Sequence, residues 1–104
     1  MIIYSVTVSI DAELRSDWLQ WMEKIHIPDV MRTGCFEAYA LQEVVDPPPQ
    51  EGTFTFNVQY HCANMETYER YREQHAAALQ ADHNRRYENR FAAFRTLLHR
   101  MLEA

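Results

Sequence analysis

Two segments alternate between apolar and polar residues, and this period of two constrains the fold of the chain more than any other feature. In residues 53–62 one face is formed by Phe54, Phe56, Val58, Tyr60 and Cys62. Residues 2–10 alternate in the same way, with Ser5, Thr7 and Ser9 on the polar face. Successive side chains of a strand point to opposite faces, so both segments are predicted to be strands with one apolar and one polar face.

A helical repeat of apolar residues follows the first strand. Its members are Leu14, Trp18, Trp21, Met22 and Ile25. They form one apolar stripe, which predicts a helix packed against a sheet. We expect the Asp11 carboxylate to cap this helix and Pro28 to end it. A further short turn is expected from Asp29, closed at Gly34.

A second helical region is predicted after Asn64, which is a suitable N-cap residue. Helix-forming residues extend to about residue 88, with a break near His75. Between the helical regions, residues 35–45 read as a less regular strand, and the proline-rich residues 46–52 read as a loop.

Residues 91–102 fit two different elements. Phe91, Phe94, Leu98 and Met101 are spaced as on a helix, but the same segment also fits a strand buried on both faces. Periodicity does not decide between them, and on the residues alone we favour a helix slightly. If the segment is a strand, the order is β-α-β-β-α-β. This is the ferredoxin-like arrangement, an α+β fold with a four-stranded antiparallel sheet, here as one domain over residues 1–104.

Composition excludes several classes of protein. The chain has 104 residues and a net charge of -5, which speaks against a nucleic-acid binder, since such proteins usually carry a basic stripe. Two glycines are too few for a glycine-rich phosphate loop. No apolar run is long enough to span a membrane, and the N-terminus lacks the positive region of a signal peptide. We therefore expect a cytoplasmic protein whose Cys35 and Cys62 stay reduced.

His26 and Asp29 are the first candidates for chemistry. The histidine lies at the predicted end of the first helix, three residues before the carboxylate. Such a pair suits acid–base catalysis or the orientation of a ligand at the mouth of a cleft. The same pattern is also typical of a histidine at a helix C-terminus followed by a capping aspartate.

His75, Asp82 and His83 form a second group, in which His75 and His83 are candidates for contact with a ligand. Their residue types suit a divalent metal ion, but they do not have the i, i+4 spacing of a tight ligand pair. The alternative is a helix packed at an interface with partly buried polar residues.

Three further residues are candidates for contact with a ligand. Trp21 could form the wall of a pocket or pack in the core, and Tyr60 could bind a ligand or satisfy a buried neighbour. Arg86 could clamp a carboxylate or phosphate, or lie at a solvated helix end.

The chain resembles an uncharacterised family, domain of unknown function 4286. The resemblance lies in Trp18 to Met22, in His26-Ile27-Pro28-Asp29, and in the stretch from His75 to His83, and it extends over nearly the whole chain. The family resembles the dimeric α+β barrel superfamily. This implies that residues 91–102 are a strand, which we follow over the helical spacing, and that two copies form a homodimer through their open sheet faces.

The most favoured function is a small-molecule pocket between helices and sheet, with His26, Asp29 and Tyr60 around it. Neither the cofactor nor any enzymatic activity is specified by the sequence. The alternatives are a non-catalytic dimeric module that binds a protein, and a metal-binding protein that uses the residues from His75 to His83.

Overall fold

The computed structural model describes all 104 residues and confirms the ferredoxin-like order of elements. The first half contains β1 (Ile2–Asp11), a 3₁₀ turn η1 (Ala12–Leu14), α1 (Arg15–Trp21), a π-helical turn η2 (Met22–His26), α2 (Ile27–Arg32) and β2 (Ala38–Glu43). The second half contains β3 (Thr53–Cys62), α3 (Met65–Gln74), α4 (Ala76–Arg86) and β4 (Phe91–His99). None of the helices is both long and apolar enough to cross a membrane.

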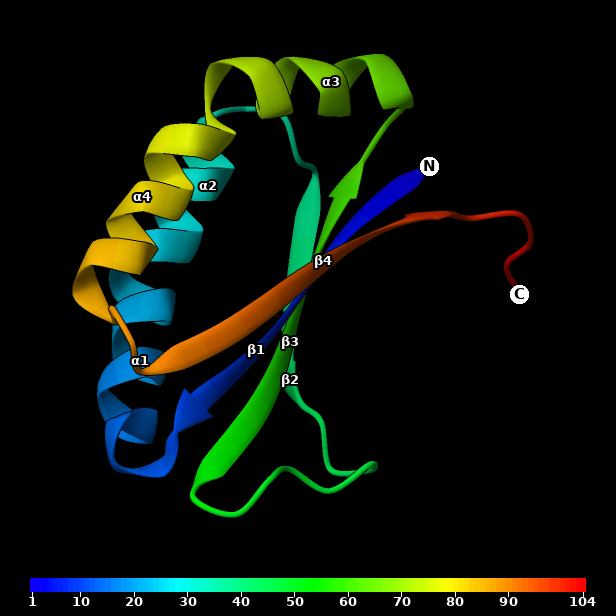
Figure 1. The fold of residues 1–104 in the computed structure, drawn as a ribbon. Helices are drawn as coiled ribbons and strands as arrows, with labels where there is room; N and C mark the ends of the chain where they lie inside the picture. The colour runs from blue at the N-terminus through cyan, green and yellow to red at the C-terminus, as the bar shows by residue number, and fades with distance from the viewer.

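The four strands form one antiparallel sheet in the order β2-β3-β1-β4. The helices all lie on one side of this sheet, and its other side is uncovered (Figure 1). Val6 on the central strand β1 pairs with Val58 on β3 and with Arg95 on β4. Because directly opposed residues of a sheet share a face, Arg95 lies on the face covered by the helices.

The last segment is a strand, so the slight preference for a helix that its spacing suggested was wrong. β4 pairs with β1 from Ile10–Phe91 to Ile2–His99. The backbone N–H and C=O groups at this edge of β1 need hydrogen-bond partners, and the nine residues of β4 provide them. The strand expected from the family resemblance is confirmed, but it ends at His99 and not at residue 102.

Pro28 does not end the first helical region, which continues to Arg32. The Ile27 N–H donates to the carbonyl of Met22, five residues earlier, as in a π-helical turn. Pro28 then lies in the first turn of α2, where proline is tolerated. Asp29 is consequently an internal helical residue and not a cap. Turns of this kind are frequent at functional sites, and His26 lies within this one.

Asp11 does not cap the first helix through its side chain either. Its carboxylate instead accepts a hydrogen bond from the Arg90 side chain, which joins the end of β1 to the segment before β4. β2 is shorter than predicted at both ends; Cys35 and Phe36 lie buried in the core before it begins, and residues 44–45 follow its end.

The other predicted signals are confirmed. The Asn64 side chain accepts a hydrogen bond from the Thr67 N–H at 2.9 Å and caps α3. His75 separates α3 from α4, and Gly34 has a φ of 76° just after α2. β3 has the predicted bounds, with Phe56, Val58, Tyr60 and Cys62 buried beneath the helices.

Candidate functional site

A small cavity lies between the helices and the covered face of the sheet. Its volume is about 40 Å³, and 14 residues from β1, β3, β4 and the helices line it. The lining side chains that can donate or accept hydrogen bonds or carry charge are Tyr4, His26, Tyr60, Tyr71, Gln80, His83 and Arg95. This space accommodates a few water molecules, so an organic ligand enters only if flexible lining side chains such as Met22 move.

His83 is held in this cavity by a hydrogen bond to an indole. The Trp18 Nε1–H donates to Nε2 of His83 over 2.9 Å, and both side chains are buried. An indole can only donate, so Nε2 must be unprotonated and Nδ1 carries the proton in the neutral ring. Nδ1 has no hydrogen-bond partner within the protein and is available to a ligand.

The electrostatic surroundings also keep His83 neutral. Burial lowers its pKa to about 4, and nearby His26 and Arg95 contribute to the decrease. His83 is therefore an uncharged hydrogen-bond donor at neutral pH.

His26 is the second imidazole of the cavity, with its ring centroid 6.0 Å from that of His83. Burial lowers the pKa of His26, while Asp29 and Asp82 partly oppose the decrease. Neither ring nitrogen has a hydrogen-bond partner in the protein, so His26 can accept a proton from a ligand or donate one.

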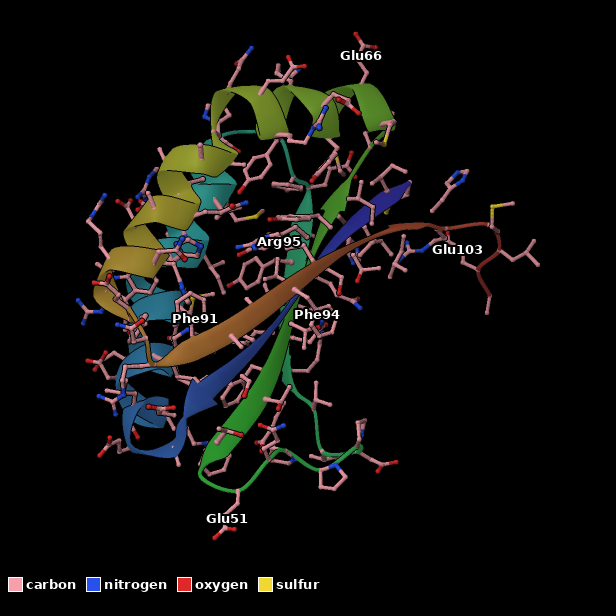
Figure 2. The ribbon with its side chains drawn as sticks, viewed as in Figure 1. Glu51, Glu66, Phe91, Phe94, Arg95 and Glu103 are labelled. Carbon is pink, nitrogen blue, oxygen red and sulfur yellow. The ribbon has the colours of Figure 1, made fainter.

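Arg95 contributes the cavity's cationic group. Its Nε–H donates to the Tyr4 hydroxyl over 3.1 Å, and no carboxylate forms a salt bridge with it. Phe91 and Arg95 extend from β4 toward the helices, whereas Phe94 extends toward the uncovered side (Figure 2). The guanidinium thus reaches the cavity from the edge strand.

Tyr60 and Tyr71 add two buried phenols. Burial raises the pKa of both hydroxyls above the ordinary value, so they remain protonated. Neither hydroxyl has a hydrogen-bond partner in the protein. They can therefore act as hydrogen-bond donors but not as phenolate bases at neutral pH.

Of the residues singled out from the sequence, the structure brings His26, Tyr60 and His83 to this cavity. Trp21 lies behind it, stacked on His26 with ring centroids 5.0 Å apart. Arg86 lies on the outer side, 5.6 Å from the Trp21 ring and 3.3 Å from the Asp17 carboxylate.

Asp29 and His75 are not among the lining residues. The Asp29 carboxylate forms a salt bridge with Arg32, although its charge still affects His26. His75 lies at the α3–α4 junction near Tyr71. No three His, Cys, Asp or Glu side chains lie close enough together to hold a metal ion, so the metal-binding alternative has no support.

The sequence matches a known family model over residues 1–101, described as a domain of unknown function, DUF4286. The chain belongs to the DUF4286 family. A search of curated proteins found no match to the DUF4286 chain.

Solved structures with the same fold come from proteins of low sequence identity. An ethyl tert-butyl ether D (EthD) family protein from Bacillus halodurans is 10% identical with a TM-score of 0.70, covering 97% of this chain and 100% of its own. A candidate antibiotic biosynthesis monooxygenase from Deinococcus radiodurans is 20% identical with a TM-score of 0.69, covering 100% and 96%. A dimeric ferredoxin-like protein from an uncultured marine organism is 13% identical with a TM-score of 0.50, covering 97% and 98%. At these identities the likeness shows the fold of the DUF4286 chain.

Sequence reasoning missed Tyr4, Tyr71, Gln80 and Arg95 as site residues. Arg95 carries the clearest signal, because it occupies an inward position of β4 between Ala93 and Leu97, where an apolar residue is the norm. That signal becomes visible only once the segment is assigned as a strand. Trp18 was predicted on the apolar stripe, but its hydrogen bond to His83 depends on tertiary packing.

Proposed function

We propose that this protein binds a small organic molecule in the cavity between the helices and the sheet. The observation that carries the proposal is that two imidazoles, both kept toward the neutral form, line one cavity at a centroid distance of 6.0 Å. Titratable groups with shifted pKa values that converge on a cavity are typical of ligand and active sites.

The two histidines have different roles in this proposal. His26 has both ring nitrogens free and serves as the acid–base group, and the Asp29 charge restores part of the basicity that burial removes. His83 is oriented by Trp18 and donates its Nδ1–H to the ligand. Tyr60 donates a further hydrogen bond, and Trp21 supports the His26 ring from behind.

The methionine methyl groups provide a test of ligand entry. In ¹³C-methyl-methionine protein, an aromatic fragment that enters the cavity should shift the Met22 signal while the exposed Met65 and Met101 signals stay in place. His26→Gln should weaken binding or turnover of such a fragment, whereas the exposed control His99→Gln should not. A fragment library that never shifts Met22, or shifts all the methionines alike, would contradict the proposal.

We also propose that the uncovered face of the sheet is covered by a second copy of the chain. Four polar side chains at its centre already hydrogen-bond with one another, since the Asn57 amide donates to Ser5 and Thr7 and accepts from Gln42. Covering them therefore costs little desolvation. On the same face the Phe94 side chain is 63% exposed, and a hollow of about 550 Å³ lies between the sheet and the proline-rich loop.

Phe94→Glu is expected to convert the dimer to a monomer, because it places a charge in the apolar part of the interface. Leu97→Glu is the matched control: Leu97 lies on the same strand and is 40% exposed, but belongs to the other face. Native mass spectrometry should report a dimer for the wild type and Leu97→Glu and a monomer for Phe94→Glu. A monomeric wild type, or a dimeric Phe94→Glu, would refute this arrangement.

A further inference from the structure

The charges around the cavity are unusual for this chain. Acidic residues outnumber basic ones by 15 to 10 in the sequence, yet none of the 14 lining residues is acidic. Arg95 is the one lining residue with a permanent charge. The lining of the cavity therefore carries a positive formal charge, whereas the net charge of the chain is negative.

Nearly all the other arginines have a carboxylate partner. The side chains of Arg15, Arg32, Arg72, Arg85, Arg86, Arg90 and Arg100 each lie within salt-bridge distance of an acidic group. Arg95 is exposed, and its only partner in the protein is the Tyr4 hydroxyl, which accepts from Nε, so no protein group binds the two terminal nitrogens. A guanidinium offers its terminal N–H groups in a planar fork that matches a carboxylate.

Nearby carboxylates do not neutralise this cation. Asp29 and Asp82 act on the His26 side of the cavity, but they are bound by Arg32 and Arg85 on the outer surface. The groups whose ionisation Arg95 does affect are His26, His83, Tyr68 and Tyr71, none of which is negatively charged at neutral pH.

From this geometry we infer that the ligand of the cavity carries an anionic oxygen, as a carboxylate or an enolate does, which the Arg95 guanidinium binds beside the Tyr4 hydroxyl. The ligand's body lies among Val6, Val58 and the aromatic rings. This inference rests on the proposed small-molecule site and names the chemical class of its ligand.

Benzoate and benzamide test the inference, because they have nearly the same shape and differ in charge. Binding is followed through the Met22 methyl signal. The wild type should bind benzoate about tenfold or more tightly than benzamide, as a charge-assisted hydrogen bond requires. Arg95→Gln should abolish this preference and Arg95→Lys should retain part of it. Arg100→Gln removes the same charge just beyond the end of β4 and should leave the preference unchanged.

The outcomes separate the inference from the function on which it rests. Equal binding of the two probes by the wild type, or an undiminished preference in Arg95→Gln, would overturn the anion assignment and leave the cavity proposal standing. If neither probe perturbs Met22, both fail. Thermal unfolding verifies that each variant is folded. If Arg95→Gln does not fold, the preference for benzoate is compared between the wild type and Arg95→Lys.

Discussion

Replacing Trp18 with alanine should lower the free energy of unfolding by about 3–5 kcal/mol, the range for removing a buried tryptophan. The indole has no exposed surface and stacks on Phe56 with ring centroids 5.1 Å apart. Its removal leaves a cavity and also leaves Nε2 of His83 without its donor. A domain of this size has a total stability of about 5–15 kcal/mol, so the variant should be marginally stable.

Two other variants separate packing from hydrogen bonding. Trp18→Phe keeps an aromatic ring against Phe56 but loses the N–H, so it should be less destabilising than alanine and should raise the pKa of His83. Trp21→Ala removes a half-buried indole and should cost less than Trp18→Ala. Urea unfolding measures the free energy of unfolding of the three variants. A Trp18→Ala protein as stable as Trp21→Ala would contradict the described core.

Acidification should destabilise the protein through His83 before most carboxylates titrate. The pKa of His83 is about 4 in the folded state and 6.5 for an ordinary histidine. Between these values the unfolded chain binds more protons, so stability is fully present above pH 6.5 and falls as the pH falls toward 4. This shift corresponds to about 3 kcal/mol in total, of which about 2 kcal/mol is lost by pH 5. His26 contributes in the same direction, because its pKa is also lowered.

Urea unfolding at pH 7.5, 6 and 5 measures this loss. His83→Gln should reduce the loss of unfolding free energy between pH 7.5 and 5, although this variant is less stable than the wild type at pH 7.5. His99→Gln removes an exposed imidazole and should keep the wild-type slope. A wild-type protein with constant stability from pH 7.5 to 5 would show that His83 is not held neutral.

The sequence was most informative where one face of an element is buried and the other is not. β3 alternates over its whole length, and its predicted bounds agree with the structure. The capping residue Asn64 and the break at His75 were also visible, because each acts through its own neighbours in the chain.

The remaining features depend on contacts between distant residues. β4 is a strand because β1 supplies its hydrogen-bond partners, and its own spacing suits either element. The helix passes through Pro28 because a π-helical turn accommodates the missing N–H. The place of Arg95 at the cavity follows from its pairing with Val6, which the sequence does not show. The roles of His26 and His83 required the two helical regions to be packed together.

The most direct test of the central claim is the ¹⁵N spectrum of the histidine side chains at pH 6. We predict that His83 is neutral and protonated on Nδ1, and that benzoate or benzamide shifts the signals of His26 and His83 but not of His99. A His83 ring that is charged at this pH would contradict a ligand site built on neutral histidines. So would His26 and His83 signals that neither probe shifts.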